Sequence, residues 1–303
     1  MLNIGIIGCG NWSLKVLEEI ERNKNFNLKS ILCRNYNLKN IKFKNKIKIY
    51  EDIEKFFHQN LNDCVYVAGT PELNLQAVKL AKINNIPLVL EKPISNSYMK
   101  SKELQLIANK NKLVILPNLT NYFSESFVYF KNFVEENFFE INKIIIYEGG
   151  NGPFRSNIHP IWDWGFHSFS TLIKIFENKK FSQIKKKEIK KNNSYQNGII
   201  TKFNFKIDSR FEVKLITGNL FKKKIRKIKI LLKNNHVLQL NMISHIIYLN
   251  GNIVFENKRT PIQSLLKKFD RAIKEKDTDL SQNLINISCK TTKILEDFYK
   301  NDY

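Results

Sequence analysis

The amino-terminal part of the chain alternates short apolar runs with amphipathic segments. The apolar runs predict buried strands at residues 2–7, 28–34, 64–69, 86–93 and 113–118. Apolar spacings of three and four predict helices after residue 10, where Leu14, Leu17 and Ile20 share one side, and at 51–60, 73–85 and 97–112. Alternating strands and helices are typical of a parallel sheet with crossover helices. We therefore predict an α/β fold whose amino-terminal sheet is doubly wound.

Beyond about residue 120 the pattern changes, and strands with one polar face dominate. A helix at 124–137 precedes a strand at 142–150, and an aromatic segment then begins a helix that runs to Phe176. Polar and apolar residues alternate around Asp208-Ser209-Arg210, which predicts a hairpin of 201–207 with 210–216. Further strands are predicted at 224–233, 236–243 and 245–256, with closing helices at 262–276 and 282–300. This half is predicted to be α+β with a mostly antiparallel open sheet.

Length and composition favour two packed domains. The chain has 303 residues, of which 43% are hydrophobic, so two cores can form. No apolar run approaches the roughly 18 residues that a membrane span needs. The amino-terminal "MLNIGIIGCG" lacks the basic and long apolar regions of a signal peptide. We therefore expect a cytoplasmic protein that has no membrane partner.

The four cysteines are far apart in the sequence and form no CxxC pair. Cys9, Cys33, Cys64 and Cys289 each stand in an apolar or helical context. This spacing favours reduced, buried thiols over a zinc site or a disulfide framework. No metal is expected.

The formal net charge of +22, taken alone, suggests nucleic acid or another anionic partner. The lysines are, however, spread over the whole chain among many Asn and Ile residues. Denser runs occur at 185–191 and 222–233, and in the second Ile228 and Ile230 alternate with Lys227 and Lys229. A solvated strand face and a patch for an anionic substrate or partner both fit these runs. Specific nucleic-acid binding is not predicted, because no helix-turn-helix, zinc-finger or RNA-binding signature occurs.

A glycine pair follows the first predicted strand and opens the first helix. Gly8 permits a tight turn, and Gly10 lets the backbone approach a pyrophosphate, which the helix amino terminus attracts. Ser13 stands where the dinucleotide-binding pattern has its third glycine, so an ordinary strand-to-helix turn is the alternative. No acid ends the second strand, and Arg34 stands at or beside that place. Arg34 favours NADP over NAD, unless it is simply a surface charge.

A Lys-Pro element ends the fourth predicted strand. "VLEKPIS" places Glu91, Lys92 and Pro93 at the carboxyl end of this strand, where open α/β sheets bind their ligands. A lysine there can hydrogen-bond a substrate hydroxyl and stabilise a developing alkoxide. Lysines at strand ends are common, so a purely structural role is the alternative.

The segment "HPIWDWGFHSF", residues 159–169, contains a second candidate site. On a helix, Asp163 and His167 lie four apart and share one face. Histidine side chains ordinarily titrate near neutrality, so His167 suits a base for a hydroxyl proton, with Asp163 orienting it or holding a neighbouring hydroxyl. A buried Asp–His pair that caps the helix is the alternative. His159 is a weaker candidate because it precedes Pro160, and Arg155 could meet a substrate carboxylate or phosphate or form a salt bridge.

Together, "IGIIGCGNW", "VYVAGTPELNLQAVKLAKINNIPLVLEKPIS" and "WDWGFH" resemble the glucose–fructose oxidoreductase, inositol dehydrogenase and MocA family of NAD(P)-dependent oxidoreductases. The order and spacing match along nearly the whole chain. The resemblance implies a Rossmann domain at 1–119 and a substrate-binding and oligomerisation domain at 120–303. It also implies a homo-oligomer, a dimer or tetramer formed through the open sheet. The implied reaction is hydride transfer to or from a secondary alcohol of a sugar, nucleotide sugar or inositol. The segment from "NGPFR" to "PIWDWGFH" is similar to family members encoded among surface-sugar biosynthesis genes.

The resemblance also implies roles for single residues. Lys92 binds the reacting hydroxyl, His167 accepts its proton and Asp163 supports them. Substrate binding is expected to involve these three together with Arg155 and Asn121. The residues expected to bind the cofactor are Gly8, Gly10, Asn11, Trp12, Arg34, Thr70, Pro71, Glu91 and Lys92.

Three departures from the family pattern leave alternatives open. Ser13 replaces a glycine, Asn74 replaces a histidine that often follows the "TP" element, and "NLTNYF" lacks a frequent arginine. A catalytically silent member that binds a nucleotide or sugar and acts by interaction is therefore one alternative. A basic interaction protein, suggested by the lysine runs, is another.

Overall fold

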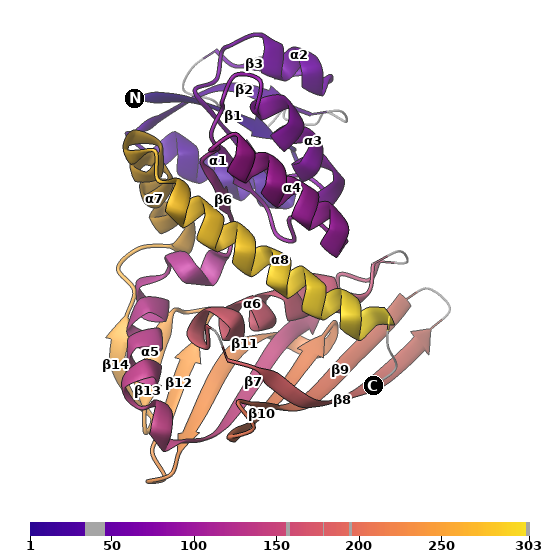
Figure 1. Ribbon diagram of the computed structural model, residues 1–303, viewed down its shortest axis with the longest axis vertical. Helices are drawn as coiled ribbons and strands as arrows, with labels where there is room; N and C mark the ends of the chain where they lie inside the picture. Colours follow the sequence, from indigo (N-terminus) through magenta and orange to yellow (C-terminus); the bar gives the residue numbers. More distant parts are fainter. Residues whose placement is uncertain (34–45, 156–157, 178, 194–195, 301–303) are drawn as a thin grey trace. The chain divides into compact units, whose positions relative to one another are not determined.

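The structure is a computed structural model that describes residues 1–33, 46–155, 158–177, 179–193 and 196–300. The chain forms two compact units, and each is described by itself (Figure 1). Unit 1 contains Met1–Thr120 and Pro261–Thr292, and unit 2 contains Asn121–Thr260 and Lys293–Tyr303. The division expected from the sequence, 1–119 and 120–303, instead assigns 261–292 to the second domain.

Unit 1 contains a six-stranded sheet with the order β3-β2-β1-β4-β5-β6. The strand pairings are parallel, and the order turns back between β1 and β4, so the predicted doubly wound sheet is confirmed. The strands are β1 (Leu2–Ile7), β2 (Phe26–Leu32), β3 (Lys48–Tyr50), β4 (Cys64–Val67), β5 (Leu88–Leu90) and β6 (Ile115–Pro117). The pattern did not predict β3, because its three residues include only one that is buried.

Helices connect these strands and cover the sheet. They are α1 (Asn11–Arg22), α2 (Ile53–His58), α3 (Pro71–Ala81) and α4 (Tyr98–Lys110). All residues of β4 and β5 are buried, as expected for parallel strands that are covered on both faces. The predicted apolar side of α1 is buried through Val16, Leu17 and Ile20.

Two helices from the end of the sequence complete unit 1. They are α7 (Pro261–Glu275) and the part of α8 (Thr278–Lys300) that extends to Thr292. Phe269 stacks on Phe26 with 6.2 Å between ring centroids, and the backbone N–H of Ile115 donates to the Ser281 hydroxyl at 2.7 Å. Because such long-range packing leaves no local pattern, the sequence-based domain division did not anticipate it.

Unit 2 contains an eight-stranded sheet with the order β14-β13-β12-β11-β7-β10-β9-β8. Among the described pairings of this sheet only that of β7 with β10 is parallel, so the sheet is mostly antiparallel, as predicted. The predicted hairpin forms, with Phe211 opposite Ile207. The strands are β7 (Ile141–Asn151), β8 (Phe181–Asn193), β9 (Gln196–Ile207), β10 (Phe211–Gly218), β11 (Leu220–Leu232), β12 (Val237–Asn241), β13 (Ile246–Leu249) and β14 (Asn252–Glu256).

The lysine run at 185–191 lies in β8, which was not predicted as a strand. Lysine is depleted in strands, so propensity gave no signal there. The run pairs with β9 in antiparallel register, and the Lys186 ammonium donates to the Phe298 carbonyl at 2.8 Å. Tertiary contacts therefore determine that this segment forms a strand.

Helical segments cover the unit 2 sheet. They are η1 (Thr120–Phe123), α5 (Glu125–Glu136), η2 (Phe138–Glu140), a π-helical turn η3 (Ile161–Gly165) and α6 (Phe166–Ile175). The helix predicted from the aromatic segment is thus divided into a π-helical turn and an α-helix. Phe169 of α6 packs on Phe203 and Phe298, which joins the helices to the sheet.

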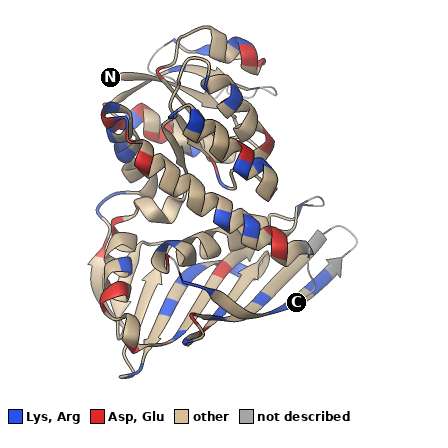
Figure 2. Cartoon of the chain, in the orientation of Figure 1, with Lys and Arg blue, Asp and Glu red and all other residues tan. Residues whose placement is uncertain are grey.

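Charge is distributed over both units. Figure 2 shows Lys and Arg on helices and strands alike, with Asp and Glu interspersed. In β11 the alternating pattern places Ile228 and Ile230 in the core, with 1% exposure each, and Lys227 and Lys229 on the opposite face. No helix in the described part of the chain is long and apolar enough to cross a membrane.

Candidate active site

The glycine turn connects β1 to α1 at the carboxyl edge of the unit 1 sheet. Gly8 has a φ of +114°, and a Cβ there would lie 2.6 Å from the Ala68 carbonyl oxygen. Gly10 directly precedes α1, and a Cβ there would meet no described atom within 4 Å. The fold therefore requires glycine at position 8, whereas the open space at Gly10 fits a ligand that approaches the backbone. The turn and the amino end of α1 thus fit the pyrophosphate of a dinucleotide.

Alanine at these two positions is expected to have opposite consequences. Gly8→Ala should destabilise the protein by roughly 1–3 kcal/mol, because it combines a positive φ with a close contact. Gly10→Ala should cost about 1 kcal/mol or less, since a φ of −78° suits any residue. Gly10→Ala should nevertheless weaken NAD(P)H binding by about tenfold. Thermal unfolding and cofactor titration measure both effects, and unchanged affinity in Gly10→Ala would contradict the assignment of the turn.

Ser13 occupies the position of the missing third glycine. It is 1% exposed, and its hydroxyl donates to the Ala68 carbonyl at 3.4 Å. A Cβ on Gly8 would lie 3.0 Å from the same hydroxyl oxygen. Ser13 therefore packs beneath the turn and joins α1 to the end of β4.

Cys9, inside the glycine turn, forms a disulfide with Cys33, the residue directly after β2. Their Cα atoms are 5.7 Å apart, within the usual range for disulfides. The prediction of reduced thiols is wrong for this pair, because the parallel pairing of β1 and β2 brings their carboxyl ends together. Cys64 and Cys289 are buried free thiols, as predicted, and burial raises the pKa of both. Arg34, on which the NADP preference rests, lies outside the described residues.

Glu91 follows β5 and is held by three side chains of unit 1. Its Oε1 accepts hydrogen bonds from Trp12 Nε1 at 2.6 Å, the Tyr66 hydroxyl at 2.6 Å and Asn118 Nδ2 at 2.7 Å. Burial, and then the Glu91 charge, raise the pKa of Tyr66, so the phenol remains a donor. The carboxylate is therefore fixed in direction, and Trp12 in the first turn of α1 is tied to the end of β5.

Asn74 supports the backbone that carries Lys92. Asn74 is 1% exposed, and its Nδ2 donates to the carbonyl oxygens of Glu91 at 3.0 Å and Pro93 at 3.2 Å. The departure from the family at Asn74 thus has a structural function in the loop after β5. Lys92 itself is half-buried. The other expected cofactor residues at this edge of the sheet are Asn11, the first residue of α1, Thr70, which precedes α3, and Pro71, which begins it.

In unit 2, Asp163 lies in the π-helical turn and His167 lies in the first turn of α6. Asp163 forms an ion pair with Arg155 at 3.1 Å, so the salt-bridge alternative for Arg155 is present. The Asp163 side chain is 20% exposed and that of Arg155 is 51% exposed. Single π turns inside helices are frequent at functional sites, because they redirect side chains. The simple i, i+4 geometry expected for Asp163 and His167 is thereby altered.

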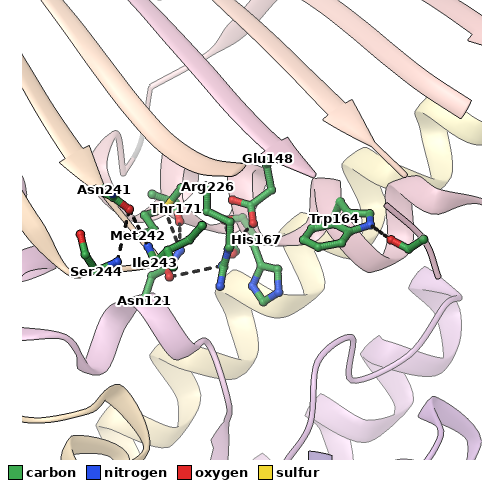
Figure 3. A network of polar contacts seen from close by, with 12 residues as sticks. Asn121, Glu148, Trp164, His167, Thr171, Arg226, Asn241, Met242, Ile243 and Ser244 are labelled. Atoms are coloured by element: carbon green, nitrogen blue, oxygen red, sulfur yellow. Dashed lines mark hydrogen bonds and ion pairs between the residues drawn. The ribbon is translucent and has the colours of Figure 1, made fainter. Parts of the chain in front are cut away.

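A buried ion pair lies beside His167 in the close view of unit 2 (Figure 3). Glu148 of β7 and Arg226 of β11 are direct cross-strand partners, and Arg226 Nε donates to Glu148 Oε1. The Glu148 side chain is fully buried, and that of Arg226 is 11% exposed. Figure 3 shows the His167 imidazole and the Arg226 guanidinium side by side in this view, both pointing away from the sheet. The half-buried His167 therefore lies next to a charged pair of unit 2.

Asn121 ties this cluster to its surroundings. It is 4% exposed, and its Nδ2 donates to Thr171 Oγ1 on α6 and to Met242 Sδ, both at 3.2 Å. Its Oδ1 accepts from Arg226 Nη2 at 3.5 Å. Both ends of the Asn121 amide thus hold α6 and Arg226 in place (Figure 3).

Sequence reasoning missed Glu148 and Arg226, although the alternation contains a signal. Arg226 is in phase with the buried Ile228 and Ile230, and Glu148 is in phase with the buried residues of β7. A charged residue at an apolar position of a strand requires a buried partner. His245 was also missed, and burial followed by the charge of Arg226 lowers its pKa.

His159, the weaker candidate, is held before the π-helical turn. Its Nδ1 accepts the Ile161 backbone N–H at 3.2 Å, and its Nε2 lies 3.2 Å from Glu188 Oε1 on β8. The Tyr299 ring packs against the imidazole at 5.8 Å. Burial lowers the pKa of His159 and outweighs the opposing effect of Glu188. These contacts fit a structural function. No group of three or more metal-binding side chains occurs among the described residues.

The comparisons with known proteins agree with this geometry. Residues 2–119 match the model of the oxidoreductase family with an NAD-binding Rossmann fold. Residues 2–119 belong to that family. No curated protein matches the chain in sequence.

Solved structures of the same fold cover almost the whole chain. UDP-N-acetylglucosamine 3-dehydrogenase from Acidithiobacillus ferrooxidans is 12% identical with a TM-score of 0.76, covering 99% of each chain. Scyllo-inositol dehydrogenase from Lactobacillus casei, with NAD(H) and scyllo-inositol, is 15% identical with a TM-score of 0.73, covering 100% of this chain and 98% of that one. A 3-ketoreductase from Actinomadura kijaniata, with TDP-benzene and NADP, is 10% identical with a TM-score of 0.78, and the match covers 98% of this chain and 96% of that one. At these identities the likeness shows the fold.

Proposed function

We propose that the protein is an NAD(P)-dependent oxidoreductase that acts on a secondary alcohol of a sugar, nucleotide sugar or inositol-like substrate. The observation that carries the proposal is the position of Lys92 and the open glycine turn at the same carboxyl edge of one parallel sheet. Membership of residues 2–119 in the oxidoreductase family supports it. The neighbours named as a UDP-N-acetylglucosamine 3-dehydrogenase, a 3-ketoreductase and a scyllo-inositol dehydrogenase support the substrate class.

The residues around the glycine turn fit a nicotinamide dinucleotide, which supplies the hydride acceptor or donor when it is bound. Gly8, Gly10 and Asn11 would hold the pyrophosphate at the amino end of α1. Trp12, Thr70, Pro71 and Glu91 would form the remainder of the binding surface. Arg34 would favour NADP by pairing with a 2′-phosphate.

The proposed chemistry divides the work between the two candidate residues. Lys92 donates a hydrogen bond to the reacting oxygen and stabilises the negative charge that develops there. His167 takes the hydroxyl proton in oxidation and returns it in reduction. Asp163, held by Arg155, supports the substrate beside His167. Arg226, whose charge is neutralised by Glu148, provides a fixed polar group beside His167.

Titration of the purified protein with NADH and NADPH tests the cofactor half of the proposal. Trp12 lies in the first turn of α1 and is 37% exposed, so its fluorescence should respond to bound nicotinamide. We expect saturable binding of both cofactors, with NADPH tighter. No binding by folded protein would refute the proposal. Binding without turnover across a broad panel of sugars and inositols would favour the catalytically silent alternative.

We also propose that the protein is a cytoplasmic homo-oligomer. Light scattering after size-exclusion chromatography would measure the mass of the particle, with a dimer or tetramer expected. A monomer at micromolar concentration would contradict this part of the proposal.

A further inference from the structure

The disulfide joins two segments that the backbone already holds together. The Gly8 N–H donates to the Leu32 carbonyl at 2.9 Å, which ties the glycine turn to the end of β2. The Cys33 N–H donates to the Tyr50 carbonyl at 2.8 Å, which ties the same point to β3. The Cys9–Cys33 bond thus adds a second link where the sheet already provides one. Because these backbone hydrogen bonds do not involve the sulfur atoms, we expect the two cysteines to remain neighbours when the bond is reduced.

The bond lies in the part of the fold that the proposed function assigns to the cofactor. In doubly wound sheets, the glycine turn approaches the pyrophosphate and the residue at the end of the second strand meets the adenosine ribose. Here Cys9 stands between the two glycines of the turn, and Cys33 stands directly after β2. The covalent bond directs both side chains toward each other, so Cys33 is not available to the ribose.

We propose that Cys9 and Cys33 form a thiol–disulfide switch within the dinucleotide site and that the oxidised form binds NAD(P)H more weakly than the reduced form. This inference rests on the proposed function. With the bond present, the two sulfur atoms are held together between the turn and the end of β2. With the bond reduced, the Cys33 side chain is no longer fixed toward Cys9 and can rotate toward the ribose hydroxyls.

A hydroperoxide is the proposed oxidant and a protein or small-molecule dithiol is the proposed reductant. Cys9 is half-buried and Cys33 is 2% exposed, so Cys9 is the accessible member of the pair. The Cys9 sulfur attacks the peroxide oxygen, the O–O bond breaks, and a sulfenic acid and an alcohol form. The Cys33 thiol attacks the sulfenic sulfur, forming the S–S bond and releasing water. A dithiol returns two electrons and two protons through a mixed disulfide and becomes a disulfide itself.

The other two cysteines provide matched internal controls. Cys64 begins β4, at the amino edge of the sheet and therefore away from the glycine turn, and it is 0% exposed. Cys289 is 2% exposed in α8, and its thiol donates to the Ser101 carbonyl at 3.3 Å. Burial raises the pKa of both thiols, which makes them poor nucleophiles.

The test compares reduced and hydrogen-peroxide-treated protein. Thiol titration in denaturant should find four thiols after reduction and two after treatment. NADPH and NADH titrations should then show binding weaker by about tenfold in the oxidised form. Treatment with a dithiol should restore it. In Cys33→Ser and Cys9→Ser the difference between treatments should disappear, whereas Cys64→Ser should retain it.

The outcomes separate this inference from the proposed function. Equal or tighter binding by the two-thiol form, or four thiols after treatment, would overturn the switch and leave the oxidoreductase proposal standing. Absence of binding by the fully reduced protein and by both serine variants would refute the proposed function, and the switch with it. Circular dichroism of each sample establishes that folded protein was compared.

Discussion

Replacing Lys92 by Met is expected to lower kcat by roughly 10²–10³-fold while leaving the affinity for NAD(P)H close to that of the unaltered protein. Loss of one preorganised donor at a developing oxyanion typically has this effect. Met keeps most of the length of the side chain without its ammonium group. The hydrogen bonds from Asn74 to this loop go to main-chain oxygens, so the backbone should remain in place. Steady-state rates with the substrate found in the panel, together with cofactor titration, measure the two quantities.

Two comparisons sharpen this prediction. Lys100→Met, on the exposed side of α4, changes the net charge equally and should leave kcat unaltered. His167→Asn should also reduce kcat, and the double variant with Lys92→Met should lose much less than the product of the single effects, since groups acting on one oxygen are not additive. Undiminished turnover in Lys92→Met would sink the catalytic assignment.

Replacing Arg226 by Met is expected to destabilise unit 2 by about 3–5 kcal/mol, because the fully buried Glu148 carboxylate would lose its counter-charge. For a domain of this size, that corresponds to a fall in Tm of roughly 10 °C. Differential scanning calorimetry should detect the shift in the transition of unit 2. The same variant should perturb catalysis only through the position of His167.

The Lys143–Glu212 pair serves as a matched control on the same sheet. This pair joins β7 to its other neighbour, β10, with 3.1 Å between Lys143 Nζ and Glu212 Oε2. The Lys143 side chain is 36% exposed and that of Glu212 is 64% exposed. Lys143→Met should therefore cost less than about 1 kcal/mol. In Arg226→Met combined with Glu148→Gln, much of the lost stability should return, since no buried charge remains. Equal Tm values for Arg226→Met and Lys143→Met would show that the buried pair contributes no more to stability than the exposed pair.

Local patterns predicted most of the fold because each strand had to bury an apolar side. β4 and β5 stood out as unbroken apolar runs, and the hairpin of β9 and β10 stood out by strict alternation. The lysine-rich β8 did not, because its strand conformation depends on pairing with β9. The position of α7 and α8 also depends on distant contacts.

The candidate site was predictable only where chain geometry fixes it. Lys92 and the glycine turn could be placed at one edge, because the carboxyl ends of parallel strands meet there. The cluster of Glu148 and Arg226 depends on a cross-strand register between residues 78 apart in sequence. The disulfide likewise depends on β1 lying beside β2, which cysteine spacing alone does not reveal.

The return of residues 261–292 to unit 1 sets the order in which the protein can fold during synthesis. Ile285 and Cys289 belong to the same apolar core as Val65 and Leu90, so that core stays incomplete while they are still inside the ribosome. The first 120 residues therefore emerge with part of the apolar surface of their sheet uncovered. The strands of unit 2 all lie in the sequence between the two parts, so its sheet can form earlier. A nascent chain halted before α7 would thus present exposed apolar surface to chaperones, although every residue of the glycine turn and Lys92 had already been made.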